Sequence, residues 1–132
     1  MRLSPTIRAG AWAAVVSGAP STVHALLTGR DALEATKAAG SILLPRETRT
    51  ARLVGAAVPV HLTLSFGWAF VLQRARVHGA ARGALAGLAI AALDLGVVGS
   101  RLPRVRALPL APQVADHLVY GAVAGLALSR RR

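Results

Sequence analysis

The chain has 132 residues, of which 54% are hydrophobic and 16% are charged, whereas an ordinary soluble domain carries about 25% charged residues. This length allows one domain, and the mean hydropathy of +0.51 favours an integral membrane protein over a soluble one. The lack of cysteine excludes disulfides and thiolate metal sites, and aromatic residues, at 4%, are too few for a base-stacking nucleic-acid module.

The net charge of +11 comes from basic residues that mostly flank the apolar runs instead of forming one patch. These flanking residues are Arg30, Arg46, Arg49, Arg52, Arg74, Arg76, Arg82, Arg101, Arg104, Arg106 and Arg130 to Arg132. Arginines at such intervals are typical of membrane spans, where they anchor helix ends and contact anionic lipid head groups. The charge therefore predicts a bilayer as the partner and no nucleic acid.

Four apolar segments each approach the ~20 residues that cross a bilayer, and they predict four transmembrane helices. They cover about residues 9–28, 53–73, 80–100 and 110–129. Proline at positions 20 and 59 is expected to kink the first and second helices. We therefore predict an all-α integral membrane protein, with residues 1–132 forming a single four-helix transmembrane domain.

The segment between the first two spans predicts a short amphipathic helix over about residues 31–44. Asp31 is a candidate N-cap, and Glu34 lies at the capping-box position three residues later. Small apolar residues follow, and an apolar patch precedes Pro45. We expect this helix to lie in the membrane interface instead of crossing the bilayer.

The orientation follows from the arginines beside the spans. An even number of spans puts both termini on one side, but the two sides carry equal numbers of basic residues. The terminal triplet Arg130 to Arg132 and the tight turn from Arg74 to Arg82 resemble cytoplasmic anchors, which predicts cytoplasmic termini. The preference for arginine over lysine, with abundant alanine and glycine, indicates a GC-rich bacterial genome and hence a bacterial plasma (inner) membrane.

Polar and small residues recur at helical spacing along each predicted span. The four stripes are Ser17, Ser21, His24 and Thr28; His61, Ser65 and Trp68; Gly83, Gly87, Ala91 and Asp94; and His117, Gly121 and Gly125 with Asp116 and Tyr120 beside them. In the last two, Gly83, Gly87, Gly121 and Gly125 form small-xxx-small motifs. Such glycines let helix backbones approach closely in lipid, so we expect the third and fourth helices to pack through them.

Five ionisable residues are predicted to share the half of the membrane that faces away from the termini. They are His24, His61, Asp94, Asp116 and His117. An ionisable residue inside a span costs free energy, which makes this set the candidate functional site.

Three interpretations of the five residues are open. The acids can pair with a histidine or an arginine and hold the helices together. The set can form a proton or cation path, because histidine titrates near neutrality. In the third interpretation, a divalent metal would use His24, His61 and His117 with one aspartate. We predict no metal and no cofactor, and we keep these histidines only as the ligand set of that third interpretation.

The stretches "SGAPSTVHALLTGRDALEATKAAGSILLP" and "VADHLVYGAVAG" resemble small multi-pass membrane proteins of actinobacteria-like, GC-rich bacteria, a resemblance that implies no known activity. Catalytic loops and zinc-protease motifs are absent, which favours a protein that is not an enzyme. We predict an accessory or structural membrane component that packs with another membrane protein or with further copies of itself. The alternative is a small proton- or cation-coupled transporter that uses the Asp/His set.

Overall fold

A computed structural model describes residues 3–129, and this part of the chain is 78% helical without a strand. The all-α prediction is confirmed. The elements are α1 (Pro5–Val16), α2 (Ala19–Leu27), α3 (Glu34–Gly40), α4 (Thr50–Arg74), α5 (Ala80–Ala91), the π-helix η1 (Ala92–Val98), the 3₁₀ turn η2 (Gly99–Arg101), α6 (Pro103–Arg106) and α7 (Leu110–Ser129). The predicted anchor Arg130 to Arg132 lies outside the described residues.

Two stretches of the chain are long and apolar enough to cross a membrane. They are Thr50–Arg74, which is α4, and Ala80–Arg101, which runs through α5, η1 and η2. By length and composition, these helices are consistent with a location in a membrane.

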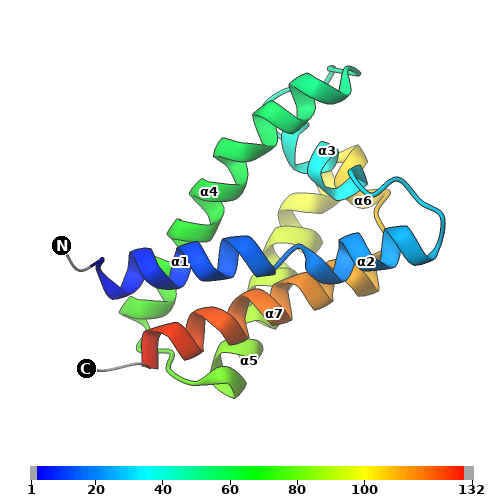
Figure 1. The fold of residues 1–132 in the computed structure, drawn as a ribbon. Coiled ribbons are helices and arrows are strands. Elements are labelled where there is room, and N and C mark those ends of the chain that lie inside the picture. Colours follow the sequence, from blue (N-terminus) through cyan, green and yellow to red (C-terminus); the bar gives the residue numbers. More distant parts are fainter. Residues whose placement is uncertain (1–2, 130–132) are drawn as a thin grey trace.

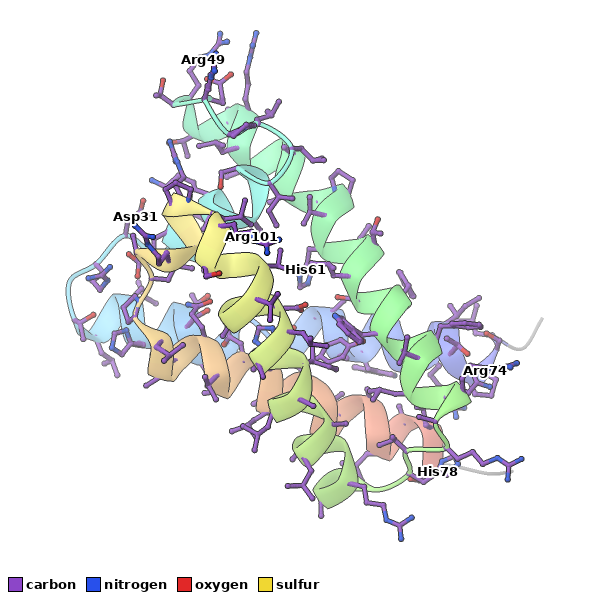
Figure 2. All side chains as sticks on the ribbon, turned by 180° about the vertical axis from the view of Figure 1, so that it is seen from behind. Asp31, Arg49, His61, Arg74, His78 and Arg101 are labelled. Atoms are coloured by element: carbon purple, nitrogen blue, oxygen red, sulfur yellow. The ribbon has the colours of Figure 1, made fainter. Side chains whose placement is uncertain are left out.

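The helices form two layers that cross obliquely (Figure 1). In one layer, α1 and α2 lie end to end, and α7 packs along both of them. The second layer holds α4 and α5, which Figure 2 brings to the front. Between the layers, α4 packs on α1 and α5 packs on α7, while α3 covers the first turns of α4. The core consists largely of alanine, including Ala9, Ala13, Ala69 and Ala124, and small side chains allow the helices to lie close together.

The first apolar segment is not one kinked helix but two helices, α1 and α2, separated by Ser17 and Gly18. Pro20 explains the interruption. It has no N–H to donate to the carbonyl of Val16, and its ring would collide with that carbonyl in a continuous helix. Pro59 acts differently, because α4 continues through it without a break.

The helix after the first apolar segment is shorter than predicted. It begins at Glu34, with Leu33 as the N-cap residue, and ends at Gly40. Asp31 stabilises the preceding turn instead, because its carboxylate accepts the backbone N–H of Leu33 at 2.8 Å. Glu34 pairs with Arg30 at 2.8 Å and does not form a capping box. Gly40 brings α3 against α4, since a Cβ there would collide with the Leu53 carbonyl.

Glycines from two helices meet at the interface of α5 and α7. A Cβ on Gly83 would collide with the carbonyl oxygen of Gly121, and a Cβ on Gly121 would collide with that of Gly83. A Cβ on Gly87 would likewise meet the His117 carbonyl, and one on Gly125 the Gly79 carbonyl. The two backbones are therefore in direct contact along this interface. This contact fixes the position of His117, one turn from Gly121, relative to η1.

Candidate functional site

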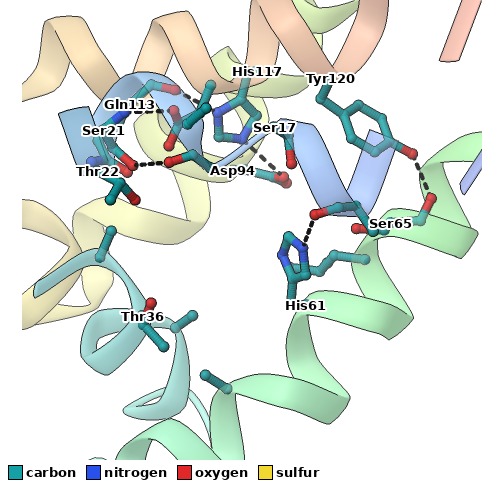
Figure 3. Close-up of a pocket in the computed structure, with 18 of the residues that line it drawn as sticks. Ser17, Ser21, Thr22, Thr36, His61, Ser65, Asp94, Gln113, His117 and Tyr120 are labelled. Carbon is teal, nitrogen blue, oxygen red and sulfur yellow. Dashed lines mark hydrogen bonds and ion pairs between the residues drawn. The ribbon is translucent and has the colours of Figure 1, made fainter. Parts of the chain in front are cut away.

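A cavity of about 600 Å³ lies between the two layers, and Figure 3 shows its polar wall. It is lined by the junction of α1 and α2, by α3 and α4, by the end of α5 with η1, and by α7. Four of the five ionisable residues singled out in the sequence line it: His61, Asp94, Asp116 and His117. His24 does not line the cavity.

His24 lies one turn beyond Ser21 on α2, and its Nδ1 is buried without a hydrogen-bond partner among the described residues. The three histidines of the metal interpretation therefore do not share one cavity wall. Within residues 3–129, no group of three or more histidine, cysteine, aspartate or glutamate side chains is arranged to hold a metal ion.

The Asp94 carboxylate and the His117 imidazole face each other on the cavity wall (Figure 3). The His117 Nε2 lies 3.5 Å from the Asp94 Oδ2, and both side chains are about one-fifth exposed. The other ring nitrogen, Nδ1, lies 2.8 Å from the backbone carbonyl of Gln113. Since a carbonyl only accepts, Nδ1 carries a proton and donates it there. Trp68 adds a second donor to the same carboxylate, because its Nε1–H binds Asp94 Oδ2 at 3.1 Å.

Asp116, a residue of α7, caps the first turn of α2. Its Oδ1 accepts the backbone N–H of Ser21 at 2.8 Å. Ser21 stands in the first turn of α2, where N–H groups have no partner within the helix and where the helix dipole favours a negative charge. Asp116 thus acts as an N-cap supplied by α7.

His61, a residue of α4, caps the other side of the interruption, where α1 ends, and it acts as a donor instead of an acceptor. Its Nε2 lies 2.8 Å from the carbonyl oxygen of Ala14, so this nitrogen donates its proton to the carbonyl. Carbonyl groups in the last turn of a helix lack partners in that helix, and a donor there is favourable. The two helix ends at the interruption are therefore held by a donor from α4 and a carboxylate from α7.

Several cavity residues do not follow from the sequence analysis. Gln113 is buried and positions His117, and Thr36 faces the cavity from α3. The sequence analysis includes Asp94 but not its conformation, because Asp94 belongs to the π-helix η1, which has no recognisable residue pattern. By contrast, His61, Ser65 and Trp68 line the same wall at their helical spacing.

The remaining acids lie outside the long apolar helices and are paired with basic residues. Glu47 contacts Arg49 at 3.2 Å and Arg52 at 3.4 Å, and the hydrogen bond from Arg49 lowers the pKa of Glu47 to about 2. Lys37 pairs with Asp31 and, with the Leu33 N–H, lowers the pKa of that carboxyl. None of these paired residues lines the cavity.

Comparison with known proteins adds no functional information. No protein-family model matches the chain, and neither the curated proteins nor the solved structures give a significant match.

Proposed function

We propose that the chain crosses the plasma membrane of a bacterium four times, with both termini in the cytoplasm. The interrupted pair α1–α2 and the helix α7 would join the two spans that length and composition identify. Large apolar side chains on the outside support this arrangement: Trp12 on α1 is 60% exposed and Leu85 on α5 is 67% exposed. Lipid accommodates such side chains, whereas a soluble monomer rarely exposes a large apolar surface.

The function that we propose is proton-coupled transport, and the Asp94–His117 pair carries the proposal. The His117 Nδ1–H donates to the Gln113 carbonyl, so the other ring nitrogen, Nε2, is the one that faces the Asp94 carboxylate. A neutral imidazole would then direct a lone pair at a carboxylate oxygen, which is repulsive. One proton between the two groups, on either partner, removes the repulsion, so the pair binds and releases a proton as a unit.

The surroundings of the Asp94–His117 pair support a role in transport over a purely structural role. Ionisable residues inside spans often mark proton relays, and interrupted helices often form the binding sites of transporters. Three other titratable groups line the same cavity: Tyr120, and His61 and Asp116, which hold the two helix ends at the interruption. A change of charge at the pair would therefore act on the contacts that fix α1 and α2.

Proton flux tests the proposal directly. The protein is reconstituted into liposomes that contain a pH-sensitive dye, and a potassium diffusion potential drives protons inward. We expect Asp94→Asn and His117→Gln to lower the initial rate at least tenfold, because each removes the shared proton. Asp31→Asn is the matched control, since Asp31 is exposed and outside the cavity. Wild-type flux equal to that of empty liposomes would contradict proton transport.

Proton binding is measured separately through Trp68, which donates to Asp94. The chain has two tryptophans, so Trp12→Phe leaves Trp68 as the only indole reporter. We expect its fluorescence to titrate with pH, and the titration to disappear in His117→Gln. Each variant must keep the wild-type elution volume and helical circular dichroism in mild detergent. A titration that persists in His117→Gln would show that the pair is not the group that binds the proton.

A second candidate function is the accessory role in a membrane assembly. The observation that favours it is the exposed apolar surface on α4 and α5, which includes Val58, Phe70 and Leu85. Such a surface can pack against another membrane protein or a further copy of the chain as well as against lipid. Affinity purification in mild detergent tests this role. A partner recovered in constant ratio would support it, and a chain that always elutes as a lipid-bound monomer would contradict it.

A further inference from the structure

We propose that the cavity binds a small organic cation, a short alkyl chain with one ammonium group, and that Asp116 provides the opposite charge. This inference deepens the proposed transport function by assigning the class of solute that would move. It rests on the charge of the cavity wall, on the acceptors it presents and on its volume.

The first argument is charge. The cavity wall carries two carboxylates, Asp94 and Asp116, and neither lysine nor arginine lines it among the described residues. One proton shared by Asp94 and His117 makes that pair neutral overall. The Asp116 carboxylate then adds a negative charge to the wall that this pair does not balance. A cation is the solute that such a wall favours, and the low dielectric of the surroundings strengthens the attraction.

The second argument concerns hydrogen-bond acceptors. Asp116 uses Oδ1 for the Ser21 N–H, and its carboxylate has a second oxygen, Oδ2, on the same cavity-lining residue. The end of α1 lies on the wall through Val15 and Ser17, and the negative end of the helix dipole is located there. The hydroxyl group of Thr36 on α3 offers a further acceptor. An ammonium group has three donors, and this part of the wall provides oxygen atoms for them.

The third argument is the size and the apolar part of the wall. A volume of about 600 Å³ suits a small organic molecule, whose pockets measure about 300–1,000 Å³. A bare metal ion would fill little of it, and the described residues contain no cluster of three metal-binding side chains. Val54, Leu64 and Ile90 add apolar surface beside the polar residues. A short alkyl chain can lie against these side chains while its ammonium group reaches Asp116.

The test uses three probes of similar shape: n-butylammonium, n-butanol and butyrate. They are titrated at constant pH into the Trp12→Phe protein in a neutral detergent, and Trp68, a cavity residue, reports binding by fluorescence. We expect saturable binding of n-butylammonium and none of the other two. Equal binding of n-butanol would overturn the proposal, because the site would then be merely apolar. Binding of butyrate alone would overturn it as well, by showing a positive wall.

Two cavity variants and one control variant distinguish an effect of the Asp116 charge on binding from an effect of altered folding. Asp116→Asn keeps an oxygen for the Ser21 N–H but loses the charge, and we expect at least tenfold weaker binding of n-butylammonium. Ala39→Leu fills the cavity from α3 without changing any charge, and it should weaken binding similarly. Asp31→Asn, an exposed acid outside the cavity, should bind as the wild type does. Unchanged binding in both cavity variants, each with wild-type circular dichroism, would overturn the proposal.

The binding measurement is independent of the transport measurement, because it uses one pH and no membrane gradient. Proton flux without n-butylammonium binding would overturn the solute assignment and leave the proposed function standing. Binding of n-butylammonium without proton flux would support the cation site and would contradict the proposed proton coupling.

Discussion

The Asp116 carboxylate accepts the backbone N–H of Ser21 at 2.8 Å, although the two residues are 95 positions apart in the chain. Together with the bond from His61 to the Ala14 carbonyl, it supplies one partner on each side of the interruption between α1 and α2. Buried backbone groups without partners cost free energy, so an interruption inside the protein requires such contacts. The presence of His61 on α4 and of Asp116 on α7 is therefore explained in part by the break that they stabilise.

The first prediction tests this capping by Asp116. Asp116→Ala removes the acceptor from the Ser21 N–H and should lower the free energy of unfolding by about 1–2 kcal/mol, the usual cost of losing an N-cap. Asp116→Asn keeps an acceptor and should lose less than half as much. Unfolding by sodium dodecyl sulfate in mixed micelles, followed by circular dichroism, measures both values. Equal losses in the two variants would indicate that charge and not capping stabilises the helix end.

The second prediction concerns the glycine contact between α5 and α7. A Cβ at Gly121 would collide with the carbonyl of Gly83 and approach the nitrogen of Gly87, so the helices must separate to accept it. We expect Gly121→Ala to destabilise the protein by about 1–3 kcal/mol, the usual cost of overpacking. Gly55→Ala on α4 is the control, because a Cβ there has nothing within 4 Å.

The control should be neutral or stabilising by up to about 1 kcal/mol, since alanine favours a helix over glycine. The same detergent titration measures both variants. If Gly121→Ala unfolds like Gly55→Ala, the two backbones are not in contact at this point.

Much of the helical architecture follows from the sequence, because an apolar run that is read as a membrane span must satisfy its own backbone groups and is therefore predicted to be a helix. The wall formed by His61, Ser65 and Trp68 also follows, since their spacing places them on one face of a single uninterrupted helix. The glycine motifs of α5 and α7 indicate close approach for an equally local reason: only glycine lacks the Cβ that would keep backbones apart.

The parts that could not be predicted depend on contacts between helices. Pro20 signals a lost hydrogen bond, but the place where α1 stops depends on His61 and Asp116, which belong to other helices. The π-helix around Asp94 has no residue pattern of its own. His24 was expected beside the other four ionisable residues, yet it does not line the cavity, because the position of a residue along a helix does not fix the direction of its side chain.

The third prediction concerns pH and the loop that precedes α4. The Arg49 hydrogen bond lowers the pKa of Glu47 from 4.5 to about 2 in the folded protein. A carboxyl with a lowered folded-state pKa stabilises the fold fully above its unfolded pKa. That contribution is therefore present above about pH 4.5 and is lost as the pH falls toward 2.

A carbon NMR titration of the Glu47 carboxyl should show the low pKa, and Arg49→Gln should move it upward. Arg46→Gln is the control, because Arg46 is an exposed neighbour that makes no ion pair with Glu47 among the described contacts. An unchanged pKa in Arg49→Gln would rule out the Arg49 side chain as the cause, since the Arg49 backbone N–H still binds Glu47 in this variant.

The last prediction concerns Tyr120, a buried residue of α7 whose hydroxyl group donates to the backbone carbonyl of Ser65 on α4. Its ring packs in the alanine-rich core, so Tyr120→Phe preserves the packing and removes only the hydrogen bond between α7 and α4. We expect a loss of about 1 kcal/mol, the net value of one such bond. Tyr120→Ala should cost about 3–5 kcal/mol, because it also leaves a cavity where the ring was. The detergent titration compares the two losses directly. A loss in Tyr120→Phe as large as that in Tyr120→Ala would mean that the hydroxyl contact, and not the packing of the ring, holds α7 against α4.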